Sequence, residues 1–378
     1  MNNSSDNKIS KSISLLVISA FVLTLFFSSG ESFYAGKNVV AEASVFNTGS
    51  VQKTLSQEEK QDTAPPTAPK YVIPMGTPFG IKLFTDGVIV ASLSDVETAD
   101  TYRCPARDAG IRPGDYIVSV NGSEANNNKS VAKLIGDSQG EEIDIEVRRG
   151  EEVISTTVKP VFSVDSFKTG MWIRDSAAGI GTLTFYDPQT GLFAGLGHGI
   201  CDMDTNGVIN MDHGEPADIS LCGIIKGEKD HPGQLQGFFS SDDSLGELLD
   251  NNETGIYGTL DTAPEGDMIE VAVKDEVDEG KAEILATVDA SGPQRYEVQI
   301  EHINQKDQKT RNFVIKVTDE RLLALTGGIV QGMSGSPVLQ NGKLVGAVTH
   351  VFTQDPTTGY GIYASTMAEE SVVYSMSK

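Results

Sequence analysis

A glycine-rich segment near the carboxyl end, Gly332-Met333-Ser334-Gly335-Ser336-Pro337, holds a serine that could act as a nucleophile. A hydroxyl attacks a carbonyl only when a base removes its proton, and the resulting oxyanion needs N–H donors about 3 Å away. The glycines allow a backbone turn tight enough to aim such N–H groups inward. We therefore expect Ser334 to be the nucleophile and the amides of Gly332 and Ser334 to form an oxyanion hole. A glycine- and serine-rich hairpin without catalysis is the alternative.

Among five histidines, His198 is the best candidate for the base that activates this serine. It follows an apolar strand, and the glycines on both sides leave its imidazole uncrowded. The other four occur in polar turns or within strands: His213, His231, His302 and His350. Asp202 and Asp204 follow His198 closely and raise the possibility of a metal site, but the remaining ligands of such a site are missing. We expect no metal and no cofactor.

A third group should fix the imidazole tautomer and stabilise the imidazolium. Asp319 follows an apolar strand and precedes Ser334 by 15 residues, so it is our candidate. Closeness in sequence does not establish contact, and three other acidic residues remain open for this role: Asp202, Asp218 and Asp230.

Short strand-like pieces separated by turn signals surround these residues from Phe162 to Lys378. This spacing predicts a mainly β fold, either a pair of β-barrels or a sandwich, with Ser334 and His198 on loops. Helix is expected only in short pieces, at Ser244–Leu249 and Met367–Ser375. A chymotrypsin-like double β-barrel, preceded by a separate domain, is the fold class that the family resemblance described below implies.

That preceding domain spans residues 71–161 and resembles a PDZ domain in the motifs "AGIRPGDYIVSVNG" and "PFGI". The resemblance implies that a peptide C-terminus or internal strand adds to a sheet edge, while backbone N–H groups hold its carboxylate. By resemblance those donors are Phe79, Gly80 and Ile81. The alternative is a closed groove that only packs on the next domain.

The amino-terminal end indicates export. Lys8 and Lys11 precede an apolar run, Ile13 to Phe27, that is shorter than the roughly 20 residues a spanning helix needs. Residues 1–30 are therefore predicted to be a signal peptide or, alternatively, a membrane anchor, and residues 31–70 a linker. The three cysteines, Cys104, Cys201 and Cys222, are too few for a disulfide scaffold, although a bridge between the last two stays open.

The overall charge excludes one class of partner. The 378 residues contain 29 Lys and Arg against 53 Asp and Glu, which gives a net charge of −24. Nonspecific attraction to phosphate backbones needs clustered basic residues, so nucleic-acid binding is not expected.

Taken together, three blocks in order resemble the SpoIVB family of stage IV sporulation serine peptidases: "GLGHGICDMDT", "VTDERLLALTGGIVQGMSGSPVLQNGKLVGAVTHVF" and "GYGI". The resemblance implies a triad of His198, Asp319 and Ser334 in a serine endopeptidase. It also implies export into the space between the two forespore membranes, self-cleavage, and cleavage of a membrane-bound inhibitor. That second cleavage would release an intramembrane protease that activates a late sigma factor.

Two other functions remain open from the sequence. The first is a non-catalytic PDZ adaptor that binds peptides and regulates a membrane protease. The second is a secreted quality-control protease, although such an enzyme is expected to carry its protease domain before its PDZ domain. The predicted layout is a signal or anchor at 1–30, a linker at 31–70, the PDZ-like domain at 71–161 and the peptidase domain at 162–378.

Overall fold

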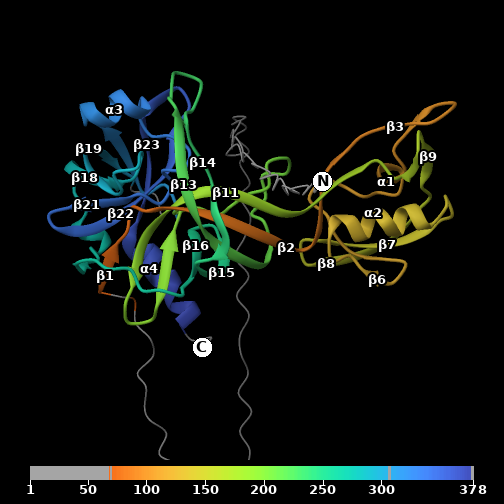
Figure 1. Ribbon diagram of the computed structural model, residues 1–378, viewed down its shortest axis with the longest axis horizontal. Helices are drawn as coiled ribbons and strands as arrows, with labels where there is room; N and C mark the ends of the chain where they lie inside the picture. The colour runs from red at the N-terminus through yellow and green to blue at the C-terminus, as the bar shows by residue number, and fades with distance from the viewer. Residues whose placement is uncertain (1–67, 69, 305–307, 376–378) are drawn as a thin grey trace, which may run out of the picture. The chain divides into compact units, whose positions relative to one another are not determined.

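The computed structural model describes residues 68, 70–304 and 308–375 (Figure 1). The predicted signal or anchor segment lies outside the described residues, and so does nearly all of the predicted linker. Within the described part of the chain, no helix is both long and apolar enough to cross a membrane.

Strands make up most of this part of the chain. They are β1 (Tyr71–Pro74), β2 (Pro78–Leu93), β3 (Val96–Glu97), β4 (Tyr102–Arg103), β5 (Tyr116–Val120), β6 (Ser123–Glu124), β7 (Ile143–Arg149), β8 (Glu152–Val158), β9 (Val161–Ser163), β10 (Ser166–Lys168), β11 (Met171–Asp187), β12 (Leu192–Gly195), β13 (Met211–Ile225), β14 (Gln234–Ser244), β15 (Gly246–Asn252), β16 (Gly255–Leu260), β17 (Ile269–Glu270), β18 (Gly280–Ala286), β19 (Gln294–Ile303), β20 (Phe313–Val317), β21 (Pro337–Gln340), β22 (Lys343–Phe352) and β23 (Asp355–Tyr363). The helices are α1 (Pro105–Asp108), α2 (Asn128–Asp137), α3 (Glu320–Thr326) and α4 (Ala364–Ser375), with a 3-10 turn, η1, at Lys274–Glu276.

The first barrel is a closed circuit of strand pairings. It runs β11-β12-β16-β15-β13-β2 and returns to β11, because β2 pairs antiparallel with both β13 and β11. Alternate side chains point inward along a strand, and those of Phe79, Ile81 and Leu83 in β2 meet Phe193 and Ile256 in one apolar core. Burial of these side chains stabilises the closed barrel, in which β2 pairs with both β11 and β13.

The second barrel is also closed, in the order β18-β19-β20-β23-β22-β21. Its core is built from alternating residues such as Ile284, Val298, Ile315 and Val348, each almost fully buried. The loop that carries Ser334 enters this barrel at β21. The prediction of a mainly β molecule with a PDZ domain and a double-barrel peptidase is confirmed.

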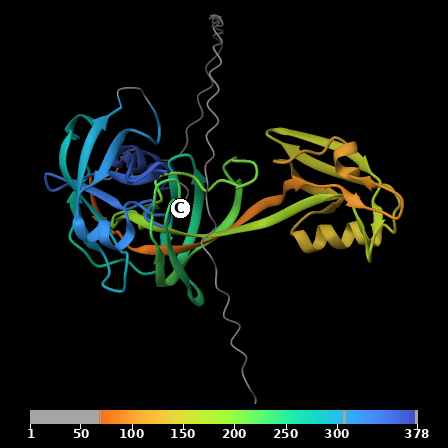
Figure 2. The same cartoon turned by 90° about the horizontal axis from the view of Figure 1, so that it is seen from above.

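Strands β2 and β11 are long, and they run side by side in both views (Figures 1 and 2). The end of β2 and the start of β11 belong to the PDZ domain, whose core contains Val88 and Val90 of β2 together with residues of β5, β7, α1 and α2. The segment between the two strands begins and ends at the same place, because the amide of Ser94 donates to the carbonyl of Gly170 at 2.9 Å. The PDZ domain is therefore inserted into a hairpin of the first barrel, and the predicted boundary after residue 161 does not separate the two cores.

The two helix predictions in the peptidase region had different outcomes. The tail prediction is confirmed, since α4 spans Ala364–Ser375. The prediction at Ser244–Leu249 is wrong, because this segment ends β14 and begins β15. The cause is tertiary: β15 pairs along its length with β16, and Leu248 is buried in the first barrel.

Candidate active site

The turn after β12 positions His198. Leu196 and Gly197 both have positive φ, 66° and 69°, which turns the chain sharply out of the strand. A Cβ on Gly197 would come within 2.9 Å of side-chain atoms of Thr349 and Ile362 in the second barrel. Only glycine fits so close an approach, so the glycine before His198 places the imidazole beside β22.

A backbone carbonyl fixes the tautomer of His198. Its Nδ1 lies 2.9 Å from the carbonyl oxygen of Gly199. Because a carbonyl oxygen only accepts, Nδ1 carries the hydrogen and Nε2 is left with a free lone pair. Burial lowers the pKa of His198 below its ordinary value of 6.5, and the Gly199 bond offsets only part of that effect. The ring is therefore neutral at pH 7, as a general base must be.

The wall of the loop after His198 is held by a buried amide. The Oδ1 of Asn251 accepts from the amide of Ile200 at 2.7 Å, and its Nδ2 donates to the carbonyls of Ile200 and Ile209. Asn251 is 7% exposed. No motif in the sequence pointed to this residue.

The loop of Ser334 is clamped by β11 of the first barrel. The hydroxyl of Thr182 donates to the carbonyl of Gly332 at 2.7 Å, and the amide of Thr182 donates to the carbonyl of Ser334 at 2.9 Å. A second hydroxyl, on Thr184, donates to the carbonyl of Gly335 at 2.8 Å. These contacts join residues about 150 positions apart, which is why spacing in the sequence could not reveal them.

The amides expected to hold the oxyanion are free to do so. Gly332 and Gly335 have φ of 97° and 95°, the conformation that glycine supports. The neighbouring amides of Met333 and Gly335 bond to the carbonyls of Val330 and Val348. Within the described part of the chain, no hydrogen bond uses the amide of Gly332 or of Ser334. Both N–H groups are therefore unpaired within the described residues, as the donors of an oxyanion hole must be before the reaction.

The structure brings Ser334 and His198 to one cleft of about 410 Å³, which both residues line together with Gly332. The Ser334 hydroxyl donates to the carbonyl of Thr349 at 2.7 Å. A hydroxyl has one hydrogen, so this bond must break before Ser334 can give its proton to His198. In this structure the Ser334 hydroxyl is therefore engaged by a backbone carbonyl, in the cleft that His198 also lines.

Asp319 lies elsewhere. It is the N-cap of α3, and its carboxylate accepts from the amides of Arg321, Leu322 and Glu297. The Arg321 guanidinium pairs with it at 2.8 Å and, with the backbone bonds, lowers the pKa of Asp319 to about 2. None of its contacts in the described structure reaches His198. The geometry therefore assigns Asp319 to capping a helix rather than to orienting the base.

The alternative acids do not take the vacant role either. Asp202 is buried and pairs with Arg174 at 3.2 Å, and Asp204 pairs with the same guanidinium. These pairings also account for the two carboxylates that had raised a metal site. Asp218 and Asp230 are exposed.

The ring found against His198 is that of His350. The two ring centroids are 4.7 Å apart with the planes tilted by 35°. Burial, with smaller contributions from the nearby His198 and Arg311, lowers the pKa of His350 to about 3. His350 follows Thr349, so β22 supplies both the ring beside the base and the carbonyl that holds the nucleophile. No pattern in the sequence singled out this histidine.

Phe79, Gly80 and Ile81 do not form a carboxylate-binding loop, which corrects their predicted position. They lie inside β2, between β11 and β13, with Gly80 opposite Ile180 and Ala217. Phe79 and Ile81 are each 1% exposed. A strand paired on both edges has no backbone donors left for a peptide.

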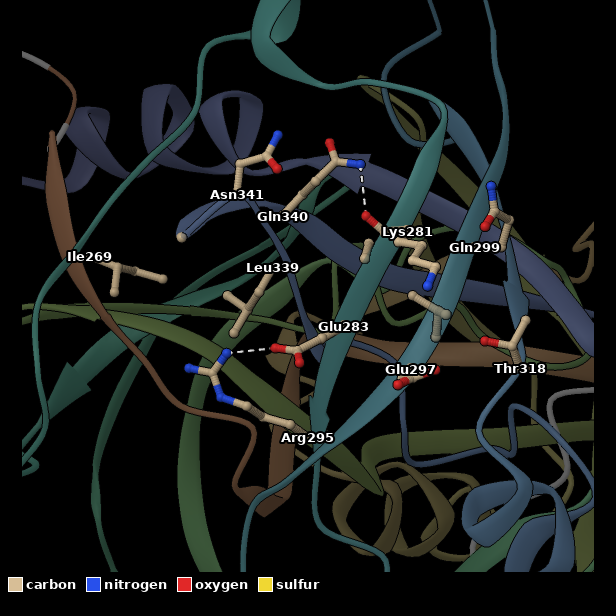
Figure 3. A pocket seen from close by; sticks show the side chains of 13 residues that line it. Ile269, Lys281, Glu283, Arg295, Glu297, Gln299, Thr318, Leu339, Gln340 and Asn341 are labelled. Carbon is tan, nitrogen blue, oxygen red and sulfur yellow. Dashed lines mark hydrogen bonds and ion pairs between the residues drawn. The ribbon is translucent and has the colours of Figure 1, made fainter.

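A second pocket, of about 420 Å³, lies on the second barrel between β18, β19 and β21 (Figure 3). Two of its charged lining residues, Arg295 and Glu283, pair at 2.7 Å. It contains neither Ser334 nor His198. The chemistry predicted from the sequence belongs to the first cleft.

The three cysteines are free thiols: Cys104 is buried, Cys201 half-buried and Cys222 exposed. The bridge between Cys201 and Cys222 that the sequence left open is therefore not formed in this structure.

The chain is similar to known protein families and to solved structures of proteases. A family model described as SpoIVB peptidase S55 matches residues 165–368, and a PDZ domain model matches residues 78–159. No curated protein sequence matches the chain. Among solved structures, the chain is similar to the Rv3671c protease of M. tuberculosis H37Rv in its inactive form, at 14% identity and a TM-score of 0.30, covering 50% of this chain and 81% of that one. It is also similar to the HtrA-type protease AlgW with decapeptide, at 13% identity and a TM-score of 0.32, covering 54% of each chain.

Proposed function

This chain belongs to the SpoIVB peptidase S55 family and is a serine endopeptidase, and from that premise we propose that it is exported and acts as a signalling protease during endospore formation. Its substrates are its own amino-terminal region and a membrane-bound inhibitor of an intramembrane protease. Cleavage of the inhibitor releases that protease, which then activates a late sigma factor. The observation that carries the proposal is the shared cleft of His198 and Ser334, next to two free backbone amides.

The reaction is acyl transfer. The Ser334 hydroxyl leaves the Thr349 carbonyl, gives its proton to Nε2 of His198, and attacks the carbonyl carbon of the scissile peptide bond. The amides of Gly332 and Ser334 donate to the oxyanion. His198 then passes the proton to the leaving amine, and a water molecule, deprotonated by the same ring, hydrolyses the acyl-enzyme. The Gly199 carbonyl holds Nδ1 throughout.

Export is proposed from the sequence of the first 30 residues, where Lys8 and Lys11 precede the apolar run. The peptidase then works in the space between the forespore membranes, where a membrane-bound substrate is accessible.

Peptide binding by the PDZ domain remains part of the proposal at a different edge from the one predicted. The start of β11, around Met171–Ile173, pairs with β2 on one edge, and α2 reaches it where the amide of Asn128 donates to Asp175 at 2.8 Å. A peptide strand added here would lie between β11 and α2.

Self-cleavage is tested by producing the full chain and its Ser334→Ala variant and determining the mature amino terminus of each by mass spectrometry. The wild-type chain should be shortened, and the variant should stay intact until wild-type enzyme is added. Equal shortening of both chains when produced alone would refute self-cleavage.

The signalling role is tested in sporulating cells whose only copy carries Ser334→Ala. The late sigma factor should stay inactive, and the membrane-bound inhibitor should persist. Normal activation of the sigma factor in these cells would contradict the proposed role.

A further inference from the structure

The cleft beside the catalytic pair has aliphatic walls. Ile180 and Ile200 are half-buried and Met203 is 36% exposed, so all three are reachable from solvent. Behind them lie Leu196 and Ile209, each 4% exposed. The wall formed by Ile200 and Ile209 is fixed by Asn251, so this shape is built into the fold.

The floor of the cleft is a run of small residues in β11, from Ser176 to Gly179. A Cβ added at Gly179 would meet nothing within 4 Å. The missing side chain at this position leaves open space that a ligand side chain can fill.

The charges at the end of the cleft are paired but leave a negative excess. Arg174 pairs with both Asp202 and Asp204, so one guanidinium faces two carboxylates. A negatively charged ligand side chain would therefore lose water without gaining a free counter-charge, which is costly. An aliphatic side chain meets no such penalty and gains from leaving water.

Position relative to His198 decides which part of a substrate enters. His198 must return its proton to the leaving amine, so the substrate on the carboxyl side of the scissile bond passes beside the loop that begins at His198. That loop, through Met203, is one wall of the cleft.

We propose that this cleft is the specificity subsite for an aliphatic side chain of the substrate on the carboxyl side of the scissile bond. The inference rests on the proposed peptidase function and adds its substrate class: extended peptides with Leu, Ile, Val or Met just after the cleaved bond. Pockets of this kind discriminate by about 10 to 200-fold per methylene group, so a leucine peptide should exceed the matched alanine peptide by at least tenfold in kcat/KM.

The first experiment exposes the full chain to a peptide library randomised on both sides of the cleaved bond, with cleavage sites read by mass spectrometry. Aliphatic residues should be enriched at the first or second position after the bond, and aspartate and glutamate depleted there. Enrichment only before the bond, or no enrichment, would overturn the proposal.

The second experiment fills the cleft. Gly179→Leu should lower the ratio of kcat/KM for leucine over alanine peptides at least tenfold. The matched control is Gly136→Leu in α2, which among the described residues is also a glycine of ordinary φ whose added Cβ meets nothing within 4 Å, and it should leave the ratio unchanged. An unchanged ratio in Gly179→Leu would refute the assignment.

A third variant tests the subsite even if Gly179→Leu does not fold. Met203→Glu changes an already exposed wall residue and should raise kcat/KM for a lysine peptide at least tenfold relative to leucine. Labelling by a fluorophosphonate separates the two levels of failure. If the wild-type chain is not labelled, the peptidase function fails; if it is labelled but Met203→Glu and Gly179→Leu leave selectivity untouched, only the subsite fails.

Discussion

At the scale of single residues, the imidazole of His198 is oriented by a carbonyl and not by a carboxylate. The Gly199 oxygen at 2.9 Å supplies the tautomer of His198, and the ring beside it belongs to His350. A carbonyl fixes the position of a proton without adding a full negative charge. Burial therefore dominates, and the pKa of His198 stays below its ordinary value.

Asp319 gives a test of this assignment. We predict that Asp319→Ala lowers the free energy of unfolding by about 2 kcal/mol at pH 7, from loss of the helix cap and the Arg321 pair. Because the folded pKa of about 2 lies below the ordinary 3.8, this contribution is present above pH 4 and is lost as the pH falls toward 2. Denaturant titrations of variant and wild type across that range measure it.

The control is Asp319→Asn, which keeps a good capping side chain and should recover part of the loss. Folded Asp319→Ala should still cleave peptide at a rate within tenfold of wild type. Loss of activity with unchanged stability would instead make Asp319 the acid of the triad.

At the scale of elements, β11 connects the two halves of the site. Its Thr182 and Thr184 hold the Ser334 loop from the first barrel, while its residues 176–180 line the cleft. We predict that Thr182→Val lowers kcat/KM about tenfold or more, because the loop loses the bond that sets its position. Steady-state cleavage of one fixed peptide measures this.

A matched variant separates positioning from stability. Thr287 is also a buried hydroxyl that donates to a distant backbone carbonyl, that of Gly76 at 2.9 Å. Thr287→Val, like Thr182→Val, should lower the free energy of unfolding by about 1 to 3 kcal/mol. Unlike Thr182→Val, it should leave kcat/KM near wild type. Equal catalytic loss in both variants would mean that Thr182 acts only through stability.

Local sequence signals pointed to Ser334 and His198, which line one cleft, but not to the framework around them. Gly197, Gly332 and Gly335 have positive φ, a conformation that few other residues adopt, so these loops could be recognised from the sequence. The cap role of Asp319 was also readable, because an aspartate followed by Glu-Arg-Leu-Leu is a helix start signal. The contacts of Thr182 and the ring of His350 arise only when distant strands meet, and no spacing encodes them.

At the scale of the whole molecule, the chain is not two domains joined end to end. The motif "PFGI" suits a PDZ strand and a barrel strand equally well by local pattern, and only pairing with β11 and β13 decides for the barrel. The PDZ domain is therefore an insertion between β2 and β11. Because these two strands continue from the PDZ domain into the first barrel, a conformational change of the PDZ domain can reach the cleft along them.

This architecture predicts the outcome of a truncation. A fragment of residues 162–378 lacks β1 and β2, and with them Val72, Phe79, Ile81 and Leu83 of the barrel cores. We expect it to be insoluble or to lack a cooperative thermal transition, whereas residues 68–378 should fold. Circular dichroism and thermal melting compare the two, and a cooperatively folded, active 162–378 fragment would contradict the insertion.

The central claim, that His198 activates Ser334 for acyl transfer, is tested most directly by covalent labelling of the full chain with a fluorophosphonate, followed by peptide mapping in the mass spectrometer. We expect one modification per chain, on Ser334, that is absent in Ser334→Ala and at least 100-fold slower in His198→Ala. No labelling of the wild-type chain, labelling of another serine, or an undiminished rate in His198→Ala would contradict it.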